Sequence, residues 1–218
     1  MVSRVEKRIN SNDDHFPLFG SKDDDRLRRQ LNFIVEADKL KNTLRQTILT
    51  DGSRRENSAE HSWHIALCAL VLSEYATDGT LDVLRVIQML IVHDLVEIDA
   101  GDTYCYDEMG RADQAEREEK AADRIFNILP PDQSETLRAL WDEYEARATP
   151  ESRFANALDR FQPLLNNYVT EGESWKQHGI KRSQVMERMK PVGDGAPAIW
   201  AFVCEFLEDA VEKGYLGD

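Results

Sequence analysis

The sequence of 218 residues predicts an all-α fold, a compact bundle of many helices. Three observations support this prediction. Apolar residues recur at helical spacing along most of the chain, and prolines and glycines interrupt the periodic segments. No stretch shows a convincing period-2 alternation of β-branched residues, so we expect no sheet.

The expected helices can be placed in chain order. The first begins at the acidic residues 23–25, carries Leu27, Leu31 and Ile34 on one face, and runs to about Leu44. After a break at 50–53, a second helix starts near residue 58 and ends at 78–79, and a third covers about 81–98. The later segments are a loop at 99–112, helices near 113–129, 133–147 and 151–170, a loop at 171–180, a short helix near 181–189 and a last helix near 196–213.

The length and composition indicate one folded domain. Hydrophobic residues make up 41% of the chain and aromatic residues 8%, which is enough for a sizeable core. We expect an N-terminal extension at 1–22 and a single domain at 23–218. The extension is polar except for residues 15–19, and it could either move freely or dock on the body.

Charge and apolar content exclude several classes of partner. A formal net charge of −14 without a run of basic residues argues against binding to nucleic acid. The longest apolar run, at 65–72, is too short to span a bilayer, and the N-terminus lacks the pattern of a secretory signal. We therefore expect a cytoplasmic protein that does not bind membranes.

The cysteines indicate reduced thiols rather than disulfides. Cys68, Cys105 and Cys204 are far apart, odd in number and form no CxxC pair, which also argues against a zinc site made of thiolates. Cys105 is the one expected in a loop.

The dipeptide His93-Asp94 is the first candidate for chemistry. It ends the strongly apolar segment VIQMLIVHD, and Asp94 follows Ile91 by three residues and Ile87 by seven, on or beside the buried face. A carboxylate buried there needs a cation or a dense set of hydrogen bonds. A histidine alone at such a position is more often a core residue bonded to a carbonyl group.

Two further residues share this character. His61 precedes Ile65 by four residues, and Asp159 lies beside Leu158 in an amphipathic helix. Each could instead be structural, with Asp159 paired to Arg160 or Arg153. Together with His93 and Asp94 they offer two imidazoles and two carboxylates, a set that suits Mn, Fe, Co, Ni, Zn or Mg.

The order H…HD…D and its flanking residues resemble a known family. AEHSW at 59–63, HDLVEIDAGD at 93–102 and NALDR at 156–160 are similar to the HD-domain metal-dependent phosphohydrolases, in particular to the YfbR-like 5′-deoxynucleotidases. The resemblance covers about residues 27–212. It implies a helical HD-domain bundle with one divalent ion held by His61, His93, Asp94 and Asp159.

The resemblance also implies an activity, the hydrolysis of a nucleoside 5′-monophosphate to nucleoside and phosphate. In related enzymes the residue matching Glu97 handles a proton on the attacking water or the leaving oxygen, and the residue matching Asp102 lies close to the substrate. Asp94 or Asp159 could position the attacking group. Glu97 follows His93 by four residues, which places both side chains on the same face of a helix. Asp102 could instead only cap a loop.

Arginines should hold the phosphoryl oxygens. Arg45 and Arg54 match arginines of the family, and Arg55 could replace Arg54 if the loop is shifted by one residue. Either could also be a solvated surface arginine.

The sequence departs from the family beside Arg45. Established nucleotidases carry a tryptophan after that arginine, and this chain has Gln46, which leaves the preference for deoxyribose open. Trp63 or Trp175 could replace the missing aromatic or could simply pack in the core. His64 follows His61 by three residues, and we expect it to support the site or to pack rather than to bind metal.

Rival functions stay open. Two-metal relatives need histidines between the HD pair and the last aspartate, and none occurs at 95–158, which favours one ion. The chain could act on another phosphorylated small molecule, or bind a ligand without turnover. Since relatives are commonly dimers, we expect a homodimer, and the apolar face of the last helix could bury itself against the body or against a partner.

Overall fold

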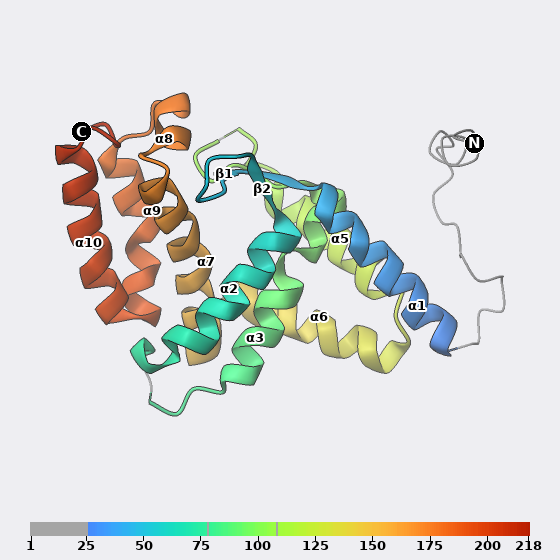
Figure 1. The fold of residues 1–218 in the computed structure, drawn as a ribbon. Helices are drawn as coiled ribbons and strands as arrows, with labels where there is room; N and C mark the ends of the chain where they lie inside the picture. The colour runs from blue at the N-terminus through green and yellow to red at the C-terminus, as the bar shows by residue number, and fades with distance from the viewer. Residues whose placement is uncertain (1–25, 78, 108) are drawn as a thin grey trace, which may run out of the picture.

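The computed structural model describes residues 26–77, 79–107 and 109–218, and its helical architecture confirms the predicted all-α class (Figure 1). The expected extension at 1–22 and the acidic start at 23–25 lie outside the described residues. The domain boundary between them therefore stays a prediction.

Helices form most of the described chain. The α-helices are α1 (Arg26–Ala37), α2 (Ser58–Leu72), α3 (Val83–Val92), α4 (Glu97–Ala100), α5 (Gln114–Phe126), α6 (Pro131–Ala146), α7 (Pro150–Val169), α8 (Glu173–His178), α9 (Arg182–Gly195) and α10 (Pro197–Glu212). Short 3-10 helices are η2 (Asp38–Asn42), η3 (Ser73–Tyr75) and η4 (His93–Val96). No helix in the described ranges combines the length and the hydropathy needed to cross a lipid bilayer.

Helix α7 forms the centre of the bundle. It packs against α2, α3, α6 and α9, and its residues Phe154, Leu158 and Leu164 are buried in the core. Helices α9 and α10 lie on one side of it, whereas α1, α5 and α6 lie toward the other end of the molecule (Figure 1). Burial of an apolar face against this helix is therefore what holds the surrounding helices in place.

The expectation of no sheet was wrong. Strand β1 (Leu44–Ile48) pairs antiparallel with β2 (Arg55–Asn57), and the turn between them contains Gly52 at φ 72°. The first helix ends at Ala37, well before the predicted end near residue 44, because the chain tightens into η2 and is extended at Thr43. Strands of five and three residues are too short for a period-2 pattern to be read with confidence.

The predicted helix at 81–98 is interrupted at the HD dipeptide. Helix α3 ends at Val92, and the chain continues through η4 into α4. The ring atom Nδ1 of His93 lies 2.9 Å from the carbonyl oxygen of Leu90, which a continuing α-helix would offer to the backbone N–H of Asp94. This break gives His93 and Asp94 directions that a regular helix would not.

Two C-terminal elements also differ from the prediction. Helix α8 occupies most of the predicted loop at 171–180, and α9 continues to Gly195 rather than stopping near 189. Pro191 lies inside α9. A Cβ atom on Gly195 would lie 2.3 Å from the backbone oxygen of Arg153, so this glycine allows α9 to approach α7 closely.

Candidate metal centre

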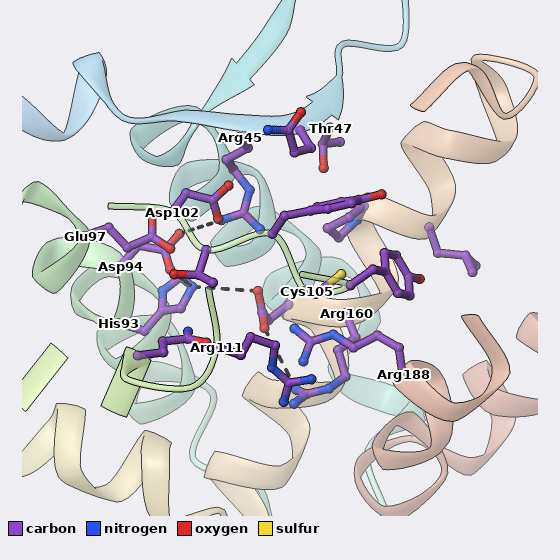
Figure 2. A pocket seen from close by; sticks show the side chains of 18 of the residues that line it. Arg45, Thr47, His93, Asp94, Glu97, Asp102, Cys105, Arg111, Arg160 and Arg188 are labelled. Carbon is purple, nitrogen blue, oxygen red and sulfur yellow. Dashed lines mark hydrogen bonds and ion pairs between the residues drawn. The ribbon is translucent and has the colours of Figure 1, made fainter. Parts of the chain in front are cut away.

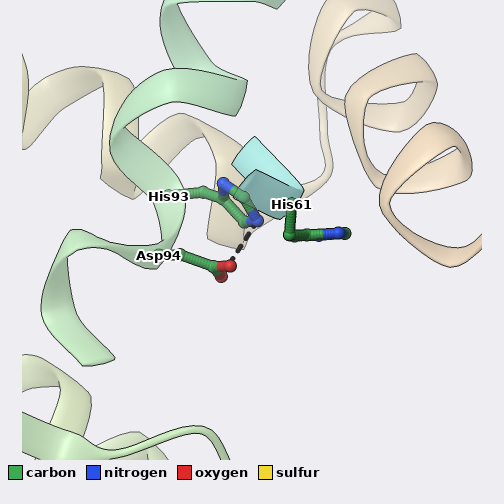
Figure 3. Close-up of side chains that lie close together, drawn as sticks. All are labelled: His61, His93 and Asp94. Carbon is green, nitrogen blue, oxygen red and sulfur yellow. Dashed lines mark ion pairs between the residues drawn. The ribbon is translucent and has the colours of Figure 1, made fainter. Parts of the chain in front are cut away.

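Four side chains predicted as metal ligands meet in the interior. One ligand atom each from His61, His93 and Asp94 can be chosen so that all lie within 4.8 Å of one another (Figure 3). Asp159 closes the group, because its Oδ1 lies 3.0 Å from Nε2 of His61 and 3.8 Å from Nε2 of His93. The structure thus brings together residues from α2, η4 and α7.

The start of α2 fixes the position of His61. Asn57 caps the helix by accepting a hydrogen bond from the backbone N–H of Glu60, and the Glu60 carboxylate accepts one from Asn57 in return. This capping box sets the register of the first turn, where His61 is completely buried. The short hairpin before it therefore has a direct role in building the site.

Hydrogen bonds orient both histidine rings. Nδ1 of His61 lies 2.8 Å from Oε1 of Gln162, and Nδ1 of His93 lies 2.9 Å from the Leu90 carbonyl oxygen. Because an amide oxygen only accepts, each Nδ1 carries a proton, and Nε2 is the ring atom that faces the carboxylates of Asp94 and Asp159. Gln162 in turn donates to Glu56 and contacts His64, so His64 supports the site without reaching its centre.

The donor set fits a divalent cation. Nε2 of His93 is buried and forms no well-aligned hydrogen bond with the described residues, although it lies 2.9 Å from Oδ1 of Asp94. Burial opposes ionisation of Asp159, yet the His61 and His93 rings beside it hold its pKa well below the usual value. Carboxylates that face the Nε2 atoms of two imidazoles in a buried space can bind a divalent cation, which takes the place of any proton on Nε2.

Glu97 and Asp102 lie beside this group, as the sequence predicted. Oγ of Ser58 donates to Oε2 of Glu97 at 2.6 Å. Burial and the nearby Asp94 carboxylate raise the pKa of Glu97 well above its usual value. Burial also raises the pKa of Asp102, although the Arg45 guanidinium opposes this effect.

Arg45 is part of the site and Arg54 is not. Nη1 of Arg45 lies 3.0 Å from Oδ2 of Asp94 and 3.9 Å from Oδ1 of Asp102. The guanidinium of Arg54 is exposed and binds both oxygens of Glu60, at 2.8 and 2.6 Å, away from the cavity. Arg55, the alternative to Arg54, is also exposed. The strand position of Arg45, rather than a helix end, is what directs it inward.

A cavity of about 370 Å³ opens beside the four ligand residues (Figure 2). Strand β1, the segment from η4 through 106, and helices α6 to α9 contribute to its wall. Trp175 lines it and is buried, whereas Trp63 is 65% exposed on the surface of α2. Cys105 also lines the cavity, and burial raises the pKa of its thiol, which disfavours a reactive thiolate.

Sequence reasoning missed several residues of the cavity wall. Tyr104 and Tyr106 line it, and so do arginines from four separate segments. Arg160 had one local signal, its place directly after Asp159. The others are scattered along the chain, and only the packing of the helices brings them together. They are Arg111, Arg147 and Arg188.

Comparison with known proteins assigns the family. The HD domain family model matches residues 37–200, three quarters of the chain. This chain belongs to the HD domain family. A solved structure from Magnetospirillum magnetotacticum MS-1, titled "Predicted metal-dependent phosphohydrolase", is 54% identical, with a TM-score of 0.85, over 88% of this chain and 96% of that one. A "conserved hypothetical protein" from Pyrococcus furiosus shares the fold, at 22% identity and a TM-score of 0.55, over 84% of this chain and 99% of that one.

Curated relatives of this HD domain chain carry an enzymatic name. The human "5′-deoxynucleotidase HDDC2" is 31% identical over 112 residues, which are 51% of this chain and 53% of the human protein. The "5′-deoxynucleotidase hdd1" of Schizosaccharomyces pombe is 26% identical over 138 residues, 61% of this chain and 68% of that protein. The chain spans about half the length of most of the curated relatives it matches. These findings confirm the predicted family and its 5′-deoxynucleotidase relatives.

Proposed function

We propose that the chain is a metal-dependent phosphomonoesterase that hydrolyses nucleoside 5′-monophosphates to nucleoside and phosphate. The observation that supports the proposal is the convergence of His61, His93, Asp94 and Asp159 beside a cavity, which the last three of them line together with Glu97. The names of the relatives, a metal-dependent phosphohydrolase and 5′-deoxynucleotidases, point to the same chemistry.

The four convergent residues would hold one divalent ion. When bound, the ion supplies a Lewis acid for a phosphoryl oxygen and lowers the pKa of a water nucleophile. Two imidazoles and two carboxylates favour Mn²⁺, Co²⁺, Fe²⁺, Ni²⁺ or Zn²⁺ over Mg²⁺, which prefers an all-oxygen set. We propose that Mn²⁺ and Co²⁺ are suitable ions for assays.

The neighbouring carboxyl groups have different roles in the reaction. Glu97 is buried and bonded to Ser58, so it can keep a proton on one oxygen and deliver it to the leaving ribose oxygen. Asp94 and Asp159 orient the attacking group on the opposite side. Asp102 lines the cavity next to Arg45, where it is placed to contact the sugar.

Arg45 would bind the phosphate that is cleaved. Its guanidinium already bridges toward Asp94, so a phosphoryl oxygen near Asp94 lies within its reach. Arg54 is not placed for this role, because both of its terminal nitrogens bind Glu60 outside the cavity.

Release of inorganic phosphate tests the proposal. We expect the Mn²⁺- or Co²⁺-loaded chain to release phosphate from a panel of nucleoside monophosphates, and His93→Ala to release almost none. Arg54→Gln is the matched control for a lost charge outside the cavity, and its rate should equal that of the wild type. If the wild type released no more phosphate than His93→Ala from any compound of the panel, the hydrolase proposal would be contradicted. The chain would then be a ligand-binding module without turnover.

We also propose a homodimer formed through the outer face of α2. Trp63, Leu67, Leu70 and Val71 are all exposed there, and no charged residue occurs between Glu60 and Glu74. Two copies with a net charge of −14 repel each other, so an uncharged apolar face is where they can approach. The apolar face of α10 is a weaker candidate, since Ile199 and Val203 are buried against the chain's own body.

The mass in solution tests this interface. Light scattering should give a dimer for the wild type and a monomer for Leu70→Glu, whereas Phe202→Glu on α10 should stay dimeric. A wild-type monomer would contradict the proposal. The absence of nucleic acid partners and a cytoplasmic location stay predictions from the sequence.

A further inference from the structure

The arginines of the cavity wall form a second group of charges, separate from Arg45. Arg111 precedes α5, Arg147 follows α6, Arg160 lies in α7 and Arg188 lies in α9. In Figure 2, Arg160 and Arg188 lie away from Arg45, on the other side of the cavity. In a chain with a net charge of −14, four guanidinium groups around one space require an explanation.

These four arginines have few acidic partners. Among the described residues, Arg111, Arg147 and Arg188 form no ion pair, and Arg160 has only Oδ2 of Asp159 at 3.9 Å from its Nη1. Arginines elsewhere are paired, as Arg138 is with Glu119, Asp123 and Asp142. The Glu118 and Glu145 carboxyl groups line the same cavity, and burial raises the pKa of each.

Arg160 is the least satisfied member. Its side chain is 3% exposed, and its Nη1 donates to the backbone and side-chain oxygens of Asn156, at 2.8 Å each. Its Nε is buried with no hydrogen-bond partner in the described chain. Burial and the nearby charge of Arg188 lower its pKa. A buried cation facing other cations is unfavourable unless an anion joins them.

Arg147 adds an independent sign of function. It follows α6 with φ 52°, in the left-handed region where glycine or asparagine is the unstrained choice. An arginine there accepts backbone strain of about 1 kcal/mol and gains no ion pair within the described residues. What the position provides is a guanidinium on the cavity wall.

One phosphate does not account for all of these charges. A phosphomonoester carries about two negative charges near neutral pH, whereas the far wall presents the guanidinium groups of Arg111, Arg147, Arg160 and Arg188. The divalent ion and Arg45 do not contribute to this excess, because Asp94, Asp102 and Asp159 already balance their charges. A single phosphate group therefore leaves part of the positive charge on this wall without a counterpart.

We propose that Arg111, Arg147, Arg160 and Arg188 form a second anion subsite, so that the substrate is a small phosphomonoester that carries a further phosphate group. This inference rests on the proposed phosphomonoesterase function. The further phosphate is either a separate monoester on the same sugar or the continuation of a polyphosphate chain, since both present the same oxygens to the same guanidinium groups.

Calorimetry on the full-length, Mn²⁺-loaded Glu97→Gln protein tests the subsite without depending on turnover. The probes are AMP, adenosine 3′,5′-bisphosphate and ADP. We expect at least one of the doubly phosphorylated probes to bind about tenfold or more tightly than AMP, because each new guanidinium–phosphate contact is charge-assisted. If only the bisphosphate binds more tightly than AMP, the further phosphate is a second monoester on the sugar. If only ADP binds more tightly, the further phosphate continues a polyphosphate chain.

Variants in the same background then assign the effect to the cluster. Arg147→Gly removes the charge and relieves the backbone strain, so it should fold well. It and Arg188→Gln should abolish the advantage of the second phosphate and leave the affinity for AMP within about threefold. Arg182→Gln on the same helix, whose partner is Glu208 at 3.8 Å, is the control and should change nothing.

The outcomes separate this inference from the proposed function. No tightening by either probe, or equal losses for all three probes in Arg147→Gly and Arg188→Gln, would overturn the subsite. Tight binding of a doubly phosphorylated probe combined with no phosphate release from any compound by the wild type would support the subsite and overturn the hydrolase proposal.

Discussion

At the scale of single residues, burial decides what each polar side chain can do. Glu97, the first residue of α4, and Arg54, which precedes α2, both have ionisable side chains, but only Glu97 is buried at the cavity. The Glu97 carboxyl group accepts a hydrogen bond from Ser58, and the nearby Asp94 carboxylate raises its pKa, whereas Arg54 pairs with Glu60 in solvent. Burial and the neighbouring groups therefore decide which ionisable side chains can take part in chemistry.

Glu97→Gln tests the proton role of this carboxyl group. We expect kcat to fall by a factor of about 10² to 10⁴, because the amide keeps the bond to Ser58 but cannot deliver a proton. Metal affinity should stay close to that of the wild type, since Glu97 is not one of the four proposed ligands. A variant with wild-type kcat would remove Glu97 from the mechanism.

Gln162→Leu tests the support of His61. The substitution removes the acceptor of the His61 Nδ1 proton while it keeps a similar volume, so metal affinity should fall by about 10- to 100-fold. A titration against a chelator of known affinity measures this loss. Gln177→Leu, on the exposed surface of α8, is the matched control. Equal affinities in both variants would show that the ring needs no such partner.

At the scale of elements, the sequence predicted helices well and their interruptions poorly. Long amphipathic segments such as α7 carry their periodicity over many turns, so local pattern is sufficient to find them. The hairpin β1–β2 depends on pairing between residues as far apart as Leu44 and Asn57, which no short window contains. The break at η4 leaves the apolar pattern intact, although a local bond from the His93 ring to the Leu90 carbonyl oxygen accompanies it. Both interruptions occur at the site, where the backbone departs from regular geometry to aim side chains.

The candidate site divides in the same way. His61, His93, Asp94 and Asp159 could be predicted because the sequence keeps a recognisable order and spacing. The arginines on the far wall could not, since Arg111 and Arg188 come from segments that meet only after α7 and α9 have packed. Local patterns reveal ligands on periodic elements, and tertiary packing alone reveals a wall assembled from several elements.

The cap of α2 gives a prediction at this scale. Asn57→Ala should lower the free energy of unfolding by about 1 kcal/mol and also weaken metal binding, because the capping box holds the turn that carries His61. Asp82→Ala removes the cap of α3, which lies at the end of that helix remote from His93, and should destabilise by a similar amount. Only the first should change metal affinity. Thermal melts and a metal titration of both variants decide this.

At the scale of the whole molecule, the metal centre joins three separate parts of the chain. The ligand residues come from α2, η4 and α7, and in the absence of a cation they place carboxylates and imidazoles against each other in the core. An ion that binds only the folded chain should therefore stabilise the whole bundle and not only the cavity.

Thermal unfolding with and without Mn²⁺ tests this coupling. At a free ion concentration of about 100 times Kd, binding should add about 2.7 kcal/mol to the free energy of unfolding and raise Tm by several degrees. The shift should disappear with EDTA and in Asp159→Asn. An equal shift in Asp159→Asn would mean that the ion binds elsewhere.

The location of the ion is the most direct test of the central claim, a one-metal centre formed by His61, His93, Asp94 and Asp159. The measurement is an anomalous difference map from crystals of the full chain grown with Mn²⁺. The account predicts a single strong peak in contact with Nε2 of both histidines and with both carboxylates, beside the cavity that contains Glu97. A map without a peak at these residues, or with two metal peaks among them, would contradict it.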